Sequence, residues 1–218
     1  VMAFFAVSPF TSTNDQKRID YLRKQLDFDL KTLMVDFTPE KNIWSNPRDR
    51  CYHCKKFIFK HIQREAQKKG FNTLFDGTSF SDLSEYRPGL MAVEELQVVS
   101  PLKDSRIKSE EIVNYLAQNG IEPYYLSSST CLATRFPYDV NLSEADIRKF
   151  DEIESYLLEL NVFPVRVRYI PQGIRIETGE SHFKEILNSK RELIAFCKRR
   201  GFKFITLDIG GLKSGSWD

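Results

Sequence analysis

The chain has 218 residues, of which 41% are hydrophobic and 28% are charged, and its net charge is +2. This composition excludes a disordered segment and a coiled coil, and the length allows one large domain or a medium domain with a small one. The balance of 32 basic and 30 acidic residues gives no electrostatic reason to propose a nucleic-acid partner first. No apolar run reaches the ~20 residues of a membrane span, and no signal peptide is evident. We therefore expect a cytoplasmic protein without a membrane anchor.

Short apolar strands alternate with amphipathic helices in the first 120 residues. The pattern predicts strands at 1–7, 33–37, 73–75 and 98–99, and a polar loop at 38–50. It predicts helices after Asn14 or Asp15, at 51–69, at 91–96 and from Ser109 to Gly120, where a glycine ends the helix. Strands that alternate with helices favour an α/β fold with a mainly parallel sheet covered by helices on both faces.

The pattern changes after a long loop at 122–140. Ser143 and Asp146 are typical of a helix start, and they predict a helix that ends near residue 160. Two consecutive strands at 162–169 and 174–178, a helix at 183–199 and a strand at 203–207 complete the chain. We therefore expect a larger domain at 1–139 and a second, smaller α/β domain at 140–218.

The first candidate for chemistry is Cys51-Tyr-His-Cys54 at the expected start of a helix. A spacing of i, i+3 places both thiols on one helical face, and a helix N-terminus lowers thiol pKa values. Two buried cysteines are an equally good interpretation of a lone Cys-x-x-Cys. A zinc site is less favoured because no second pair of Cys or His follows at a usable spacing.

The second candidate is Cys131, which follows a Ser/Thr run and precedes Thr134 and Arg135. A cysteine beside an arginine in a polar loop should be more thiolate-like than one in a core. The alternative is a core cysteine that anchors the loop. Three cysteines can hold an iron–sulfur cluster and leave one iron open. Cys197 lies on the apolar face of its helix and is predicted to be structural.

The third feature is a pair of arginines on one expected strand, Arg166 and Arg168, followed by Arg175 and Glu177 on the next. Strand alternation places Arg166 and Arg168 on one face. If the hairpin pairs Arg168 with Arg175, Arg166 lies opposite Glu177. Clustered arginines suit a phosphate or a carboxylate. The pattern alone favours a solvated face with cross-strand ion pairs.

Several short motifs together resemble the LarE family of ATP-dependent sulfur transferases, in the PP-loop ATP pyrophosphatase superfamily. They occur in order at 46–56 (NPRDRCYHCKK), 76–78 (DGT), 86–89 (YRPG), 100–102 (SPL), 131–138 (CLATRFPY), 166–168 (RVR) and 207–216 (LDIGGLKSGS). The resemblance implies a mainly parallel, Rossmann-like PP-loop sheet in domain 1–139, and a substrate or oligomerisation domain at 140–218. The family's Ser-Gly-Gly-x-Asp-Ser loop, which holds the ATP phosphates, precedes the strand with which this sequence begins, so these 218 residues do not contain it.

The resemblance implies a role in nickel-pincer nucleotide biosynthesis. Family members adenylylate a carboxylate of pyridinium-3,5-dicarboxylate mononucleotide with ATP, and a sulfur nucleophile then displaces AMP to leave a thiocarboxylate. Members with three cysteines hold a 4Fe–4S cluster that passes on an extra sulfide. ATP with Mg²⁺ would be the co-substrate, and a homo-oligomer is expected.

The same resemblance implies roles for particular residues. Cys131 would be catalytic, and Cys51, Cys54 and Cys131 would bind the cluster. The ATP-binding residues would be Asp76, Gly77 and Thr78, and the substrate-binding residues would be Thr134, Arg135, Glu154, Arg166, Arg168 and Glu177. Thr134 replaces the usual serine of the family and keeps its hydroxyl.

Two other functions remain open at this point. A PP-loop enzyme that thiolates a tRNA base can also use three cysteines and a cluster, although the near-neutral charge weighs against it. A non-catalytic metal-binding or assembly protein is the third interpretation, because the phosphate loop is missing from these residues. A phosphate loop upstream of residue 1 would favour an enzyme, and a natural start near Met2 would favour the third interpretation.

Overall fold

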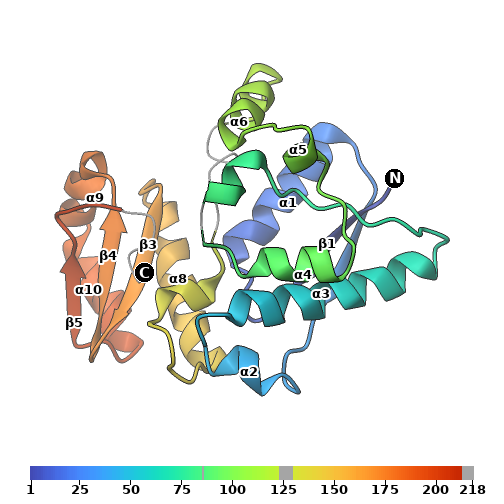
Figure 1. Ribbon diagram of the computed structural model, residues 1–218. Helices are drawn as coiled ribbons and strands as arrows, with labels where there is room; N and C mark the ends of the chain where they lie inside the picture. The colour runs from blue at the N-terminus through green and yellow to red at the C-terminus, as the bar shows by residue number, and fades with distance from the viewer. Residues whose placement is uncertain (85, 123–129, 213–218) are drawn as a thin grey trace. The chain divides into compact units, whose positions relative to one another are not determined.

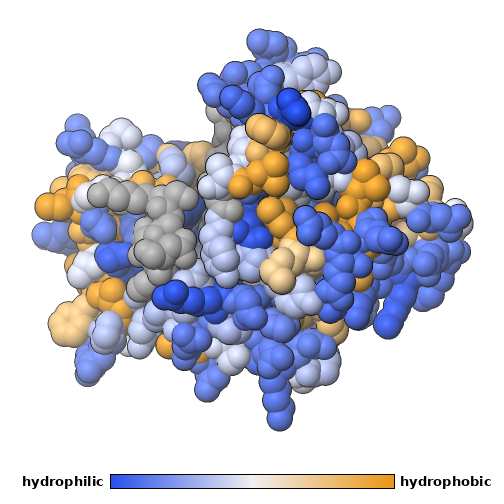
Figure 2. All heavy atoms as spheres, in the orientation of Figure 1, coloured by the Kyte–Doolittle hydropathy of each residue, from blue (hydrophilic) through white to orange (hydrophobic). Residues whose placement is uncertain are grey.

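The computed structural model describes residues 1–84, 86–122 and 130–212. The chain divides into two compact units. Unit 1 comprises Val1–Ser8 and Arg18–Leu126, and unit 2 comprises Pro9–Lys17 and Ser127–Asp218. Among the helices in the described ranges, none is both long enough and apolar enough to cross a membrane. The face in Figure 2 is covered mostly by hydrophilic residues, with separate hydrophobic patches among them.

Unit 1 contains a two-stranded parallel sheet. Strand β1 (Ala3–Val7) pairs with β2 (Leu30–Met34), from Ala3 opposite Leu30 to Val7 opposite Met34. Helix α1 (Thr13–Leu26) connects them, so the predicted helix is confirmed, but Asn14 and Asp15, the predicted caps, lie inside it. Strand β2 ends before Val35 and Phe37, which the sequence placed in the strand and which are buried just beyond it.

Helix α3 (Arg50–Gln67) carries much of the core of unit 1. Its Phe59 and Ile62 pack with Val93 of α4 (Gly89–Glu95), with Val98 and with the strand residue Phe4. Figure 1 shows α3 and α4 running side by side. Both helices lie close to their predicted ranges, because their apolar residues recur at helical spacing.

The strands predicted at 73–75 and 98–99 do not form a ladder. The structure has only an isolated parallel bridge there, between Phe75 and Val99. Gln97 has a positive φ of 53°, and Pro101 starts a short helix, so the extended stretch around Val99 is too short for a ladder. The α/β class is confirmed, but within the described residues the parallel sheet of unit 1 is small and is not a clear Rossmann sheet.

Short helices fill the connections of unit 1. They are α2 (Lys41–Trp44), the 3₁₀ turn η1 (Phe80–Ser84), α5 (Pro101–Asp104) and α6 (Ser109–Gln118). Helix α2 lies where the sequence predicted only a loop; its Ile43 is buried, and the Trp44 indole N–H donates to the Phe37 carbonyl at 2.9 Å. Helix α6 begins one residue after its cap, Lys108, whereas the sequence had placed the cap at Ser109.

Unit 2 is built on a three-stranded sheet in the order β3-β4-β5. Strand β3 (Val165–Ile170) is antiparallel to β4 (Gly173–Thr178), which is parallel to β5 (Phe204–Leu207). Arg168 lies opposite Arg175 and Arg166 opposite Glu177, so the predicted hairpin register is confirmed. An ideal Cβ on Gly173 would lie 2.3 Å from the Phe204 carbonyl oxygen, so only glycine lets β4 and β5 approach this closely.

Helix α8 (Glu144–Glu159) packs beside β3 (Figure 1). Its cap is Ser143, whose hydroxyl oxygen accepts from the Asp146 amide at 3.1 Å, so the predicted helix start is confirmed. The α8 residues Ile147, Phe150 and Ile153 are at most 1% exposed and form the core face. The same helix carries the carboxylates described below.

The remaining elements of unit 2 are the 3₁₀ turns η2 (Leu132–Arg135) and η3 (Glu180–His182) and the helices α9 (Phe183–Asn188) and α10 (Lys190–Arg199). The sequence predicted one helix over 183–199, but the structure interrupts it at Ser189. Asn and Ser compete with the helix by hydrogen bonding to nearby backbone, which explains the break after Asn188.

Candidate functional site

The residues predicted to bind substrate meet in unit 2, around the turn η2. Arg135 is 5% exposed, and its guanidinium donates to both carboxylate oxygens of Glu154, at 2.7 and 2.8 Å. Glu154 also accepts from the Val167 amide of β3 at 2.7 Å. Burial alone lowers the pKa of Arg135, but the Glu154 carboxylate outweighs it and the pKa is raised. Glu154 therefore joins η2, α8 and β3 through one buried carboxylate.

Arg168 forms a second buried ion pair. Its Nε donates to Glu177 at 3.1 Å, and its Nη1 donates to the Thr134 carbonyl at 2.6 Å. Arg168 is 3% exposed and Glu177 is 1% exposed. Arg175 adds two hydrogen bonds to the same carboxylate, at 3.1 and 2.6 Å. Burial lowers the pKa of Arg168, and Glu177 opposes that effect. Arg168 thus connects the hairpin to η2, and the solvated face that the pattern favoured is wrong for it.

Arg166 differs from both of these arginines. It is partly buried, and within the described residues it has no hydrogen bond and no ion pair. Burial lowers its pKa, and the positive charges of Arg135 and Arg168 lower it further, against the opposing effect of Glu154 and Glu177. A cation in this setting favours the approach of an anion, because an anion would offset both the burial and the repulsion.

Cys131 immediately precedes η2 and is exposed. Its carbonyl accepts from the Thr134 hydroxyl at 2.8 Å, and its thiol lies near enough to Arg135 to raise the pKa of that guanidinium slightly. Cys131 is therefore an accessible thiol beside an arginine cluster, and the alternative of a core cysteine is wrong. The serine run at 127–129 lies outside the described residues.

Cys51 and Cys54 lie in the first turns of α3 in unit 1. Cys51 is exposed, Cys54 is partly exposed and neither is in a disulfide, so the alternative of two buried cysteines is wrong. Gly89, in the YRPG motif, places the start of α4 against this turn: an ideal Cβ there would lie 3.5 Å from the Cys51 carbonyl oxygen, which is an ordinary van der Waals distance. Cys197 is fully buried in unit 2, as predicted for a structural cysteine, and burial raises its thiol pKa to about 11.

Asp76, from the DGT motif, is the centre of a polar cluster in unit 1. Its carboxylate accepts from the Ser100 and Thr78 hydroxyls, each at 2.6 Å, and from the Lys55 ammonium at 3.0 Å. Burial raises its pKa, but these hydrogen bonds outweigh burial and the net shift is downward. Gly77 has nothing within 4 Å of an ideal Cβ, so its backbone borders open space. Lys55 and Ser100 were not predicted as site residues, although both belong to the quoted motifs.

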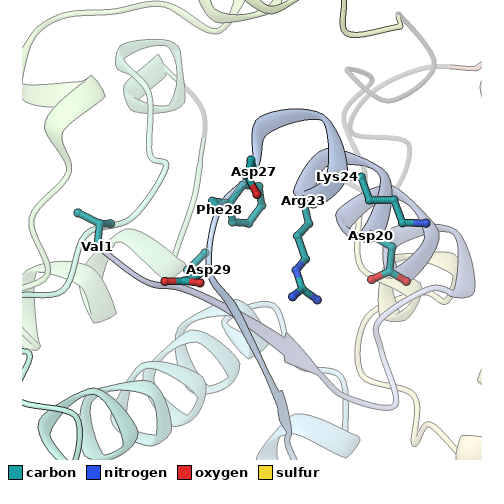
Figure 3. A pocket seen from close by; sticks show the side chains of 8 residues that line it. Val1, Asp20, Arg23, Lys24, Asp27, Phe28 and Asp29 are labelled. Atoms are coloured by element: carbon teal, nitrogen blue, oxygen red, sulfur yellow. The ribbon is translucent and has the colours of Figure 1, made fainter.

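No group of three or more His, Cys, Asp or Glu residues that could hold a metal ion occurs in the part of the chain that the structure describes. A pocket in unit 1 lies between the end of α1 and the start of β1, where Asp20, Asp27 and Asp29 balance Arg23 and Lys24 (Figure 3). None of the residues predicted for the site lines this pocket.

No family model matches the chain. It is 31% identical over 208 residues to an uncharacterized protein of Methanocaldococcus jannaschii, covering 95% of this chain and 79% of that protein. It is 32% identical over 176 residues to an uncharacterized protein of Synechocystis sp., covering 80% of this chain and 66% of that protein. The chain therefore belongs to the same family as the archaeal protein.

A third relative has an activity in its name. The chain is 26% identical over 215 residues to the pyridinium-3,5-bisthiocarboxylic acid mononucleotide synthase of Lactiplantibacillus plantarum, covering 99% of this chain and 78% of that protein. This is a distant homology to LarE. The match agrees with the resemblance drawn from the motifs, at the level of the wider family.

Proposed function

We propose that this protein is an ATP-dependent sulfur transferase that converts carboxylates of pyridinium-3,5-dicarboxylate mononucleotide to thiocarboxylates. One observation carries the proposal: the exposed Cys131 lies near Arg135, and Arg135 lies near the partly buried Arg166, which has no hydrogen bond or ion pair among the described residues. A thiol next to an anion site suits sulfur transfer to a phosphorylated substrate. The distant homology to LarE supports the same reaction.

In this proposal the substrate phosphate binds to Arg166. Arg135 and Arg168 are already committed to Glu154 and Glu177, so they supply positive potential and hold η2 in place. The Thr134 hydroxyl accepts from Arg135 at 2.9 Å and lies one turn from Cys131, where it can contact the substrate. The two buried carboxylates thus orient the cations, and they are not the groups that react.

The reaction has two steps. A substrate carboxylate oxygen attacks the α-phosphorus of ATP, the bond to pyrophosphate breaks, and an acyl-adenylate forms. A sulfur nucleophile then attacks the acyl carbon, the bond from that carbon to the AMP oxygen breaks, AMP leaves, and a thiocarboxylate remains on the substrate. Asp76, Gly77 and Thr78 are proposed to bind ATP with Mg²⁺, since the Asp76 cluster is preorganised and Gly77 leaves room beside it.

Cys51, Cys54 and Cys131 are the proposed ligands of a 4Fe–4S cluster. The cluster rests on donor chemistry alone: thiolates are the usual ligands of such clusters and none of these cysteines is in a disulfide, but among the described residues they do not form a three-residue metal-binding group. The cluster would supply the transferable sulfide. The PP-loop character of the domain at 1–139, the substrate domain at 140–218 and a homo-oligomer are part of the same proposal and rest on the distant relationship.

The test is an anaerobic assay with ATP, Mg²⁺, the pyridinium dicarboxylate and the iron-loaded protein. We expect AMP release that depends on the pyridinium substrate. The Cys131→Ala variant should still form the adenylate and release AMP on its hydrolysis, but no thiocarboxylate should form. The Cys197→Ala variant is the matched control and should retain full transfer, because Cys197 is buried.

Other outcomes identify the alternatives. Iron binding without any ATP consumption would contradict the proposal and indicate a metal-binding or assembly protein. ATP consumption that depends on tRNA, and not on the pyridinium substrate, would indicate a tRNA thiolation enzyme. Equal thiocarboxylate yields from wild type and Cys131→Ala would remove Cys131 from the sulfur-transfer step.

A further inference from the structure

A carboxylate outside the predicted site holds the start of α1 in unit 2. Thr13, the first residue of α1, donates its backbone N–H to both oxygens of Asp151, at 3.0 and 3.2 Å, and its hydroxyl donates to one of them at 2.6 Å. Asp151 belongs to α8, which is 138 residues away in sequence. The amides of a first helical turn have no partner within the helix, so a carboxylate there is favourable.

The start of α1 is in turn bonded to the Cys131 segment. The carbonyl of Phe10 accepts from the Leu132 amide at 3.0 Å, directly after Cys131. Phe10 and Leu132 are 3% and 1% exposed, so this bond is sheltered from water. Between Phe10 and Thr13 lies Ser12, whose hydroxyl oxygen accepts from the Asp15 amide at 3.0 Å and fixes the helix start.

Asp151 and Glu154 are three residues apart on α8, so both lie on the same side of the helix. Glu154 binds η2 directly, through Arg135. Asp151 is connected to η2 indirectly: it binds Thr13, and the nearby Phe10 carbonyl accepts from the Leu132 amide. The segment that carries Cys131 is therefore held at two points by one helix. Burial raises the pKa of Asp151, and hydrogen bonds from Thr13 oppose that effect. The charged form of this carboxylate is therefore disfavoured by burial and is stabilised mainly by Thr13.

We propose that Asp151 is a positioning residue, which fixes the place of Cys131 by tying the start of α1 to α8. The effect of Asp151 on sulfur transfer rests on the proposed function. The tether, which is the Thr13–Asp151 contact together with the Phe10–Leu132 bond, does not depend on that function. Asp151 does not touch the reacting atoms in this account. It acts through Thr13 and through the Phe10–Leu132 bond.

Hydrogen exchange of the Leu132 amide tests the tether without reference to activity. Asp151→Ala should raise the exchange rate of this amide roughly fivefold or more, the scale expected when a helix cap is lost. Asp151→Asn keeps an acceptor oxygen for Thr13 and should restore most of the protection. The control is Glu152→Ala, which removes an exposed carboxylate of α8 that pairs with Arg200 and should leave Leu132 unchanged.

Thr13→Val provides a milder second variant, because it removes one donor and keeps the backbone N–H; its effect should lie between those of wild type and Asp151→Ala. In the sulfur-transfer assay, Asp151→Ala should lower kcat with little change in the KM for the substrate, since the phosphate site at Arg166 is untouched. Asp151→Asn should recover kcat, because it keeps an acceptor oxygen for Thr13.

The outcomes separate the two proposals. An unchanged Leu132 exchange rate in a folded Asp151→Ala variant would overturn the positioning role, whatever the protein catalyses. Faster Leu132 exchange with wild-type kcat would also overturn it, because the tether would then not position Cys131 for the reaction. Faster Leu132 exchange in a protein whose wild type transfers no sulfur would refute only the proposed function.

Discussion

Arg166 and Arg168 lie on one face of β3, but their substitution should affect different properties. Loss of Arg168 should lower the stability of the fold, whereas loss of Arg166 should weaken substrate binding. Arg168→Ala removes a buried guanidinium and leaves the carboxylate of Glu177, 1% exposed, with less compensation. Breaking a buried ion pair costs about 3–5 kcal/mol. Because Arg175 still donates twice to Glu177, we expect the lower end, about 3 kcal/mol of unfolding free energy.

Arg166→Ala should instead leave stability unchanged or raise it slightly. Burial and the charges of Arg135 and Arg168 already disfavour the Arg166 cation, so its removal relieves repulsion. The loss should appear in substrate binding. A hydrogen bond to a charged group contributes about 1.5–3 kcal/mol, which corresponds to an increase in Kd of about 10- to 150-fold for the pyridinium mononucleotide.

Urea denaturation followed by circular dichroism, and calorimetric titration of the substrate, measure the two effects separately. The control is Arg148→Ala, which removes an exposed arginine of α8 paired with Glu144 and should change neither quantity. The reasoning is refuted if Arg166→Ala destabilises the protein as much as Arg168→Ala does. Wild-type substrate affinity in Arg166→Ala would equally remove this arginine from the phosphate site.

Three further predictions concern stability and thiol access. Hydrogen bonds from Lys31 and then Lys68 lower the pKa of Glu65 from 4.5 to about 2. The stabilisation that Glu65→Gln removes should therefore be complete above pH 4.5 and disappear as the pH falls towards 2, as measured by urea unfolding across that range. Gly173→Ala should cost about 1–3 kcal/mol, because the added Cβ meets the backbone of β5; unchanged urea unfolding would contradict this close approach. Iodoacetamide should modify Cys131 in the native protein and Cys197 only after denaturation, which peptide mass spectrometry would show; native labelling of Cys197 would contradict its burial.

Features that depend on local spacing could be predicted from the sequence. The register that places Arg166 opposite Glu177 follows from strand alternation and a short turn, and Ser143 identifies the start of α8 by its hydrogen-bonding chemistry. The break of the last helix at Ser189 was missed, because the apolar spacing of α9 and α10 is nearly continuous across it.

Features that depend on distant contacts could not be predicted in this way. The pattern places Arg168 on a strand face, but only the packing of η2 against the hairpin shows that it is buried and bonded to Thr134. The Thr13–Asp151 tether joins residues 138 positions apart, and no periodicity signals it. The short extended stretch around Val99 reads as a strand, although Gln97 and Pro101 limit its length.

Mass spectrometry of the pyridinium nucleotide after incubation with ATP and the iron-loaded protein tests the central claim most directly. The account predicts that one oxygen of a carboxylate is replaced by sulfur for each AMP released, in wild type and not in Cys131→Ala. AMP release with an unchanged nucleotide in the wild-type reaction, or no AMP release at all, would contradict it.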